Sequence, residues 1–389
     1  MTSPIGQCGR YELLRFIESG GMGEIFVARD TRPNGHTDLV ALKRLLPHAA
    51  ADEVLVGMFR DEAKLAMDLV HPNICRVFEL GRDGDQYFLV MEWIDGISLQ
   101  TFLRRSRAQG AVPYPLVARI IGAVADGLHY AHTLETITGQ HYGVVHRDVS
   151  PPNIMLGYQG EVKLLDFGLA KARTQLYKTQ PGYVKGKLGY LAPEQIAGRV
   201  DHRIDIFALG LCLYEALVGD QLFNQTTMGE TIAAIRRLEE PPSVVALRPD
   251  MPAEIDAIMR RALQPNPDQR WQAASAIRDA LAQVLESYGE VVTDQRLGAF
   301  VRHLFPEKKA LRKPAVPPPE IQSDADWDPS ADLDSLAELR PRSRKLWLLL
   351  LAALVVLALL IGILAGAGSQ PGGEPDDSRP SDEAGRGSE

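Results

Sequence analysis

The chain has 389 residues, of which 45% are hydrophobic and 24% charged, and its formal net charge at pH 7 is −8. These values are typical of globular proteins and exclude a mostly disordered chain. The net charge is negative, whereas nucleic-acid-binding domains carry clustered positive charge, so we expect no nucleic-acid partner. Cys8, Cys75 and Cys212 are scattered and show no C-x-x-C spacing. They predict neither a disulfide framework nor a zinc ribbon and are typical of reduced, cytosolic thiols.

Strand-like segments rich in β-branched and aromatic residues come first along the chain. They occupy residues 11–17, 25–29, 39–45 and 87–93. From about residue 99 the pattern changes to long helical periods. A small β-rich part followed by a larger helical part predicts an α+β fold.

Three glycines, Gly20, Gly21 and Gly23, lie between the first two strand-like segments. A tight glycine turn lets backbone N–H groups approach a phosphate, because no side chain holds the chain away. An ordinary hairpin turn is the alternative. Glu18 stands where the first glycine of a G-x-G-x-x-G pattern would be, so the motif is incomplete.

A buried ion pair is predicted between Lys43 and Glu62. Lys43 ends the apolar strand-like segment Val-Ala-Leu-Lys, and Glu62 lies within a helix predicted over residues 52–70. The apolar stripe of that helix consists of Leu55, Met58, Phe59, Ala66 and Leu69, and Glu62 lies on the same face. A carboxylate on an apolar face is costly unless a cation meets it, and Lys43 is the nearest plausible cation.

Two aspartates and an asparagine follow strand-like segments farther along the chain. Asp148 and Asn153 belong to the run His-Arg-Asp-Val-Ser-Pro-Pro-Asn, and Asp166 begins the triplet Asp-Phe-Gly. Carboxylate and amide oxygens are the ligands that Mg²⁺ prefers, with phosphate oxygens completing the shell. These residues predict a site for a magnesium-bound phosphate compound.

In this combination the motifs resemble those of bacterial eukaryotic-type (Hanks-type), membrane-anchored serine/threonine protein kinases. The resemblance covers residues 11–285 and implies a bilobal fold, with an N-lobe over about residues 11–94 and a C-lobe over about residues 95–285. Further matches are the Ala-Pro-Glu motif ending at Glu194, Asp205 as the anchor of the catalytic loop, and Arg270 as the partner of Glu194.

The resemblance implies transfer of the γ-phosphoryl group of ATP to protein hydroxyls, with Mg²⁺ as cofactor and Mn²⁺ as a substitute. It implies that Lys43, held by Glu62, binds the α and β phosphates, that Asp166 and Asn153 hold the metal, and that Asp148 accepts the substrate proton. The same resemblance assigns the nucleotide pocket to Ile17, Gly20, Gly21, Gly23, Ile25, Ala41, Lys43, Met91 as gatekeeper, the backbone of Glu92 and Ile94, and Leu156.

Two further departures from the family pattern occur after Asp148 and before the Ala-Pro-Glu motif. Ser150 stands where serine/threonine kinases have a lysine, and Lys187 replaces the threonine usual before Ala-Pro-Glu. Our hypothesis is that hydroxyl and ammonium have exchanged places, so that Lys187 returns a positive charge to the γ-phosphate while Ser150 supplies the hydroxyl. The alternative is a surface-exposed Lys187 and a weakened site.

Arg147 before Asp148 accompanies regulation by activation-loop phosphorylation in the family. We expect autophosphorylation at Thr174 or Thr179, with the phosphate pairing to Arg147 and to Lys171 or Arg173.

The C-terminal part divides into four predicted segments: a helical extension (286–305), a Pro-rich and acidic linker (306–345), a transmembrane helix (346–368) and a short extracytoplasmic tail (369–389). Residues 346–368 carry no charge and would cover about 34 Å as a helix, against a hydrocarbon core of roughly 30 Å. A buried core helix is the alternative. Basic residues before the span and acidic ones after it predict a single-pass inner-membrane protein with a cytoplasmic kinase domain.

Three alternatives to a serine/threonine kinase with cytoplasmic protein substrates stay open. A catalytically weak pseudokinase acting as a membrane-tethered scaffold is suggested by Ser150 and Lys187. Small-molecule phosphotransfer shares the chemistry, although the Ala-Pro-Glu segment favours a peptide-binding groove. Tyrosine specificity is conceivable because Ser150 removes the usual lysine. Small residues near one end of residues 346–368 also leave a homodimer open.

Overall fold

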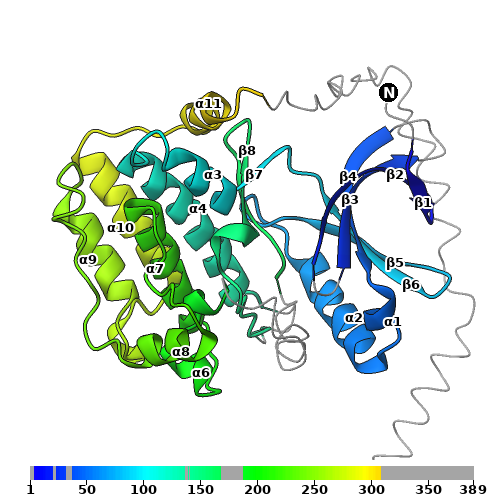
Figure 1. The fold of residues 1–389 in the computed structure, drawn as a ribbon, viewed down its shortest axis with the longest axis horizontal. Helices are drawn as coiled ribbons and strands as arrows, with labels where there is room; N and C mark the ends of the chain where they lie inside the picture. The colour runs from blue at the N-terminus through cyan, green and yellow to red at the C-terminus, as the bar shows by residue number, and fades with distance from the viewer. Residues whose placement is uncertain are drawn as a thin grey trace, which may run out of the picture. The chain divides into compact units, whose positions relative to one another are not determined.

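The computed structural model describes residues 4–20, 23–31, 37–135, 139, 141–167 and 187–307, without the side chains of Thr37, His48 and Glu62. A β-rich part and a helical part are visible side by side in Figure 1. The α+β arrangement expected from the sequence is therefore observed.

The β-rich part contains a six-stranded antiparallel sheet with the order β1-β2-β3-β4-β6-β5. Its strands are β1 (Gly6–Cys8), β2 (Tyr11–Ser19), β3 (Gly23–Thr31), β4 (Thr37–Leu45), β5 (Val77–Asp83) and β6 (Gln86–Glu92). The predicted strands agree with four of these within a few residues. Strands β1 and β5 are not among the predicted strands.

Each face of this sheet is covered by its own apolar cluster. Leu42 packs with Tyr11, Leu13, Phe26 and Phe88 on one face. The alternate residues of β4 point to the opposite face, where Ala41 and Leu45 pack with residues of helix α2 (Glu53–Asp68). Asp52 caps this helix by accepting hydrogen bonds from the backbone N–H groups of Val54 and Leu55. The short helix α1 (Pro47–Ala50) precedes it.

The predicted stripe on α2 is confirmed for its apolar members. Leu55, Phe59 and Ala66 are buried, and Met58 packs partly buried against the same cluster. Leu69, just beyond the end of α2, is buried in the core cluster of the helical part. The stripe faces the sheet, as the spacing of three and four residues predicts.

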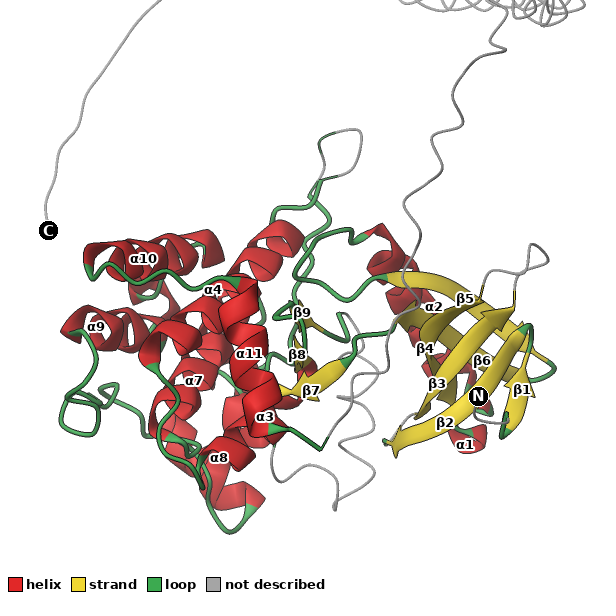
Figure 2. Ribbon diagram, turned by 90° about the horizontal axis from the view of Figure 1, so that it is seen from above, coloured by secondary structure: helices red, strands yellow, loops and turns green. Residues whose placement is uncertain are grey.

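The helical part is built around α4 (Tyr114–His132) and α7 (Arg203–Val218). Nearly every residue of α7 between Ile204 and Leu217 is buried, so this helix lies inside the core. Figure 2 shows other helices around this pair: α3 (Leu99–Ser106), α8 (Met228–Arg236), α9 (Ala253–Ala262), α10 (Ala274–Ser287) and α11 (Asp294–Leu304). The short helix α6 (Pro193–Ile196) is labelled in Figure 1.

A small antiparallel sheet of β7 (Gly96–Ser98), β8 (Ile154–Gly157) and β9 (Val162–Leu164) lies where the two parts meet. The backbone N–H of Cys75 donates to the carbonyl of Leu164 at 2.9 Å, which joins the segment before β5 to β9. Gly96 permits the close approach of β7 and β8, because a Cβ there would lie 2.2 Å from the carbonyl oxygen of Leu156.

Helix α11 docks on the helical part through one apolar face. Leu297, Val301, Leu304 and Phe305 are buried, and Phe300 is partly buried against Phe102. The helix approaches the β8–β9 turn so closely that a Cβ on Gly298 would lie 2.7 Å from the carbonyl oxygen of Tyr158.

The predicted linker (306–345), transmembrane helix (346–368) and tail (369–389) lie outside the described residues, apart from the first two residues of the linker. Within the described ranges, which end at residue 307, no helix is long and apolar enough to cross a membrane.

Candidate active site

An ion pair joins the β-rich part to the helical part. Lys43 on β4 places its Nζ 2.9 Å from Oδ1 of Asp166, which follows β9. The two side chains are only 7% and 13% exposed, so the pair is largely removed from water. Strand alternation turns Lys43 away from the Leu42 cluster and toward this junction. The structure thus brings together two of the residues that the sequence singled out.

Asp148 lies at the centre of a second polar cluster. Its Oδ2 accepts a hydrogen bond from Nδ2 of Asn153 at 2.8 Å, and its backbone carbonyl accepts from the same nitrogen at 2.7 Å. The Nζ of Lys187 lies 2.8 Å from the same Oδ2. Asn153 ends the short 3₁₀ helix Pro151–Asn153 that leads into β8. The predicted residues Asp148, Asn153 and Lys187 therefore share one site.

The backbone around these aspartates has an uncommon conformation. Arg147 (φ 67°) and Asp166 (φ 57°) are left-handed, a region that residues other than glycine rarely adopt. Such conformations cost about 1–3 kcal/mol each and persist where surrounding contacts hold them. For Arg147 those contacts come from Asp205.

Asp205, near the start of α7, holds the backbone of the loop before Asp148. Its Oδ1 accepts from the N–H of Arg147 at 2.7 Å, and its Oδ2 accepts from the N–H of His146 at 2.8 Å. The Nε2 of His132 lies 2.8 Å from the same Oδ2. Burial alone would raise the pKa of this carboxyl, but the bonds from His132 and the loop hold its pKa below the usual value.

His146 fixes the same loop from the other side. Its Nε2 donates to the carbonyl of Leu165 at 2.8 Å, and its Nδ1 accepts from the N–H of Asp148 at 3.2 Å. Because one ring nitrogen donates and the other accepts, the imidazole is neutral. Burial lowers the pKa of His146 below 6.5, because the imidazolium would lose its water.

The buried ion pair between Glu194 and Arg270 ties α6 to the core of the helical part. The two guanidinium N–H groups meet both carboxylate oxygens at 2.6 and 2.8 Å. Arg270 also donates to the carbonyls of Arg203, Gln264 and Pro265, so its charge is well compensated.

The predicted nucleotide pocket corresponds to one face of the large sheet. Ile25 pairs with Lys43, and Ala41 pairs with Met91, so the side chains of all four residues share that face. The helical part contributes Leu156, which is fully buried on β8, and Ile94 is buried between the two parts. Ile17 is exposed on β2.

Two of the three predicted glycines lie at the turn between β2 and β3. The N–H of Gly20 donates to the carbonyl of Gly23 at 2.8 Å, and a Cβ on Gly23 would lie 2.7 Å from the carbonyl oxygen of Arg44. Glycine at this position is therefore required by close packing. Gly21, the side chain of Glu62, and Thr174 and Thr179 lie outside the described residues.

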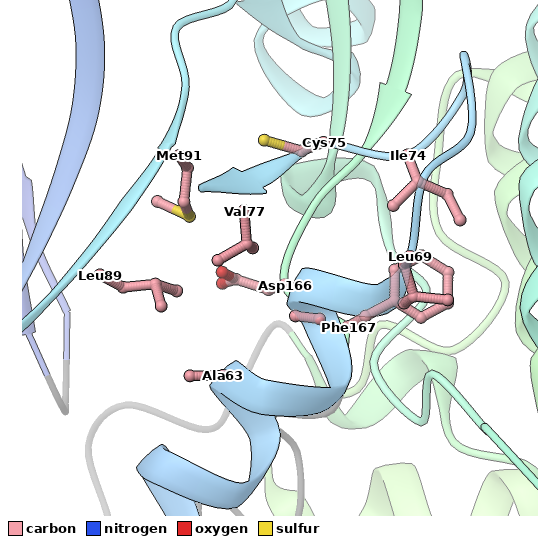
Figure 3. Close-up of a pocket in the computed structure, with 10 residues that line it drawn as sticks. Ala63, Leu69, Ile74, Cys75, Val77, Leu89, Met91, Asp166 and Phe167 are labelled. Atoms are coloured by element: carbon pink, nitrogen blue, oxygen red, sulfur yellow. The ribbon is translucent and has the colours of Figure 1, made fainter. Parts of the chain in front are cut away.

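Behind Met91 lies a small cavity of about 20 Å³, roughly the room of a single water molecule. Figure 3 shows Asp166 and Phe167 facing it from the segment after β9, with Ala63 on α2 and Val77 and Leu89 on the neighbouring strands. Its lining is otherwise apolar, which keeps water away from one side of Asp166.

The contacts of His132 and of a second cation, Lys163, were not predicted from the sequence. His132 binds Asp205, and Lys163 on β9 lies 2.8 Å from the carboxylate of Glu92. A signal for His132 was present, because it follows the buried residues Ala125 and Leu128 at helical spacing. A polar side chain on an apolar helix face needs a hydrogen-bonding or charged partner, and the same reasoning predicted a partner for Glu62. Lys163 alternates with apolar neighbours and gave no such signal.

Comparison with known proteins agrees with this geometry. Residues 11–281 match the protein kinase domain family. The chain is 43% identical over 312 residues to the tyrosine-protein kinase MasK of Myxococcus xanthus, which covers 79% of this chain and 48% of MasK. It is 33% identical over 388 residues to the serine/threonine-protein kinase PknB of Mycolicibacterium smegmatis, covering 96% of this chain and 57% of PknB.

Among solved structures, the kinase domain of PknI from Mycobacterium tuberculosis is similar in fold, with a TM-score of 0.55 and 29% identity. The match covers 73% of this chain and 99% of that domain. The chain therefore belongs to the protein kinase family and has the protein kinase fold. It spans about half the length of the curated relatives it matches. Membership of this family implies the use of ATP with a divalent metal.

Proposed function

We propose that this protein is a bacterial serine/threonine kinase that transfers the γ-phosphoryl group of ATP to hydroxyl groups of cytoplasmic proteins. The observation that carries the proposal is the convergence of Lys43, Asp166, Asp148 and Asn153 from both parts of the fold. Relatives named as serine/threonine kinases, PknB and PrkC of Bacillus subtilis, support the choice of hydroxyl.

The nucleotide would lie between the sheet face of Ala41 and the helical part at Leu156. Lys43 would bind the α and β phosphates, because its ammonium is buried and a phosphate oxygen can replace one oxygen of Asp166 as its partner. The turn at Gly20 and Gly23 allows backbone N–H groups to approach the phosphates. Alignment of this kind is the main task of a kinase, since phosphoryl transfer needs little covalent help.

The chemistry of the donor set fits a divalent metal. Asp166 supplies a carboxylate, and the amide nitrogen of Asn153 is engaged by Asp148, so its amide oxygen is the atom that remains for a cation. Bound Mg²⁺, or Mn²⁺ as a substitute, would neutralise charge on the phosphate oxygens. Asp148 would accept the proton of the substrate hydroxyl as that oxygen bonds to phosphorus, and ADP would leave with the bridging oxygen.

The test is incubation of the full chain with radiolabelled ATP, Mg²⁺ and casein, followed by phosphoamino-acid analysis. We expect phosphoserine and phosphothreonine, and loss of transfer in Lys43→Met, Asp148→Asn and Asp166→Asn or after chelation of the metal. The control is Lys64→Met, which removes an exposed lysine from α2. Nucleotide binding without transfer would instead favour the scaffold function.

Tyrosine phosphorylation is the second candidate, because the relative MasK, at 43% identity, is named a tyrosine-protein kinase. The same phosphoamino-acid analysis separates the two, since phosphotyrosine as the sole product would refute serine/threonine specificity. Intact-mass measurement after incubation with ATP tests autophosphorylation at Thr174 or Thr179.

We further propose that residues 346–368 anchor the kinase to the inner membrane as a single span. Their uninterrupted apolar sequence and the basic residues before them support this placement. Fractionation of cells after an alkaline carbonate wash tests it. The full chain should stay with the membrane pellet, and a chain lacking residues 346–368 should appear in the supernatant.

A further inference from the structure

The loop that carries Asp148 has no cationic residue between Asp148 and Asn153. Between Asp148 and Asn153 its sequence is Val-Ser-Pro-Pro. Ser150 is only 1% exposed, and its Oγ donates to the backbone carbonyl of Asp148 at 3.4 Å. This hydroxyl braces the loop from inside and carries no charge. A cation at this position has to come from another segment.

Lys187 comes from the segment before the Ala-Pro-Glu motif and reaches Asp148 from the more open side. Its side chain is 25% exposed, whereas that of Asp148 is 11% exposed. The Nζ of Lys187 and the Nδ2 of Asn153 converge on the same carboxylate oxygen, each at 2.8 Å. Two donors on one oxygen fix the rotation of the carboxylate, and one of them is a full positive charge.

The backbone that follows Lys187 is clamped onto the helical part. Lys187 leads into the 3₁₀ helix Leu188–Tyr190, and the Tyr190 hydroxyl donates to Glu215 on α7 and accepts from Gln221 at 2.9 Å. A Cβ on Gly189 would lie 2.4 Å from the carbonyl oxygen of Phe223, so the chain is pressed against the loop after α7.

Helix α7 therefore positions both members of the pair. Asp205 in its first turn holds the backbone before Asp148, and Glu215 near its end holds the segment that carries Lys187. The contact between ammonium and carboxylate is set by one rigid helix, and this argues against a chance surface contact of a flexible side chain.

We propose that Lys187 is the cation beside Asp148 in the phosphoryl-transfer site, acting on Asp148 and on the transferred group from outside the catalytic loop. The inference rests on the proposed kinase function and deepens it. When the substrate oxygen bonds to the γ-phosphorus, its proton passes to Asp148 and the bond to the bridging oxygen of ADP breaks. The ammonium of Lys187 stabilises the negative charge shared between the phosphoryl oxygens and the carboxylate.

Because the cation belongs to the segment that ends at the Ala-Pro-Glu motif, its presence depends on how that segment is docked. Disturbing the anchor of Tyr190 on Glu215 would withdraw the charge without altering Asp148 itself. Catalysis is thus coupled to the docking of the segment before the Ala-Pro-Glu motif through the side chain of Lys187.

The experiment measures kcat, KM for ATP and unfolding midpoints of the full chain with the variants Lys187→Met, Lys187→Arg, Lys187→Thr, Ser150→Lys and the double exchange Ser150→Lys/Lys187→Thr. We expect Lys187→Met to lower kcat about 100-fold with KM for ATP nearly unchanged, and Lys187→Arg to recover part of that loss. Position 150 carries the lysine in the kinases that this chain resembles, so the double exchange should be more active than the product of the single losses predicts.

Three results would overturn the inference. An increase of kcat in Lys187→Met would show that the lysine blocks Asp148. A parallel fall of kcat and unfolding midpoint, without recovery in Lys187→Arg, would show a structural role alone. A double exchange no more active than the product of the single-variant losses predicts would show that the charge is not transferable between the two positions. Absence of transfer in the unmodified chain, measured alongside, would refute the kinase function itself.

Discussion

Replacing Asp205 by asparagine should uncouple the loop before Asp148 from α7. Asparagine keeps one oxygen for the N–H of Arg147, but it places an NH₂ group where the second oxygen accepted from His146. His132 can adapt by changing its tautomer, because its Nδ1 has no hydrogen-bond partner among the described residues. The backbone N–H of His146 cannot adapt and is left facing another donor.

The expected loss in the free energy of unfolding is roughly 3 kcal/mol. A hydrogen bond to a charged group contributes about 1.5–3 kcal/mol, and a buried donor without an acceptor costs about 1–3 kcal/mol. The left-handed conformation of Arg147 stores about 1–3 kcal/mol that these bonds offset. Once they weaken, the loop relaxes and Asp148 shifts, so kcat should fall about 100-fold.

Asp256→Asn provides the matched control. Asp256 is also a buried aspartate of the helical part, and it accepts from the N–H of Val244 at 2.7 Å and from Ser243 at 3.1 Å, away from the site. Both variants should lose stability in urea denaturation, but only Asp205→Asn should lose turnover of ATP onto protein. Equal kcat in the two variants would refute the idea that Asp205 holds the catalytic backbone.

Three further predictions concern stability. Arg270→Met should lower the free energy of unfolding by about 3–5 kcal/mol, because it leaves the carboxylate of Glu194 buried without its cation; the double variant with Glu194→Gln should lose less than the sum of the single losses. Gly298→Ala should destabilise the docking of α11 by about 1–3 kcal/mol, whereas Gly229→Ala, where a Cβ meets nothing within 4 Å, should be neutral or stabilising in the same denaturation series. Because the pKa of His146 is lowered in the folded state, stability should fall as the pH drops below 6.5, and His146→Asn should show a smaller fall in Tm between about pH 7.5 and about pH 5.5.

Much of the fold follows from short-range pattern. The four strands and the helix over residues 52–70 appear near their expected bounds, because alternation and helical spacing are local properties of the chain. The two missed strands lacked that signal. Strand β1 is only three residues long, and β5 carries a bulge between Val77 and Glu79 and several polar residues. Their pairing is decided by the neighbouring strands.

The sequence by itself determined which side chains this protein has for chemistry: a lysine at the end of an apolar strand, two aspartates and an asparagine after strands, and glycines at a turn. Only the tertiary structure decided which of them meet. Lys43 and Asp166 are 123 residues apart in the chain, and Lys187 and Asp148 are 39 apart, yet both pairs come within hydrogen-bonding distance. Spacing along a chain fixes the face of an element on which a residue lies, whereas contact between elements depends on packing. Here α7 holds the segments that carry Asp148 and Lys187, and the small sheet lies where the two parts meet.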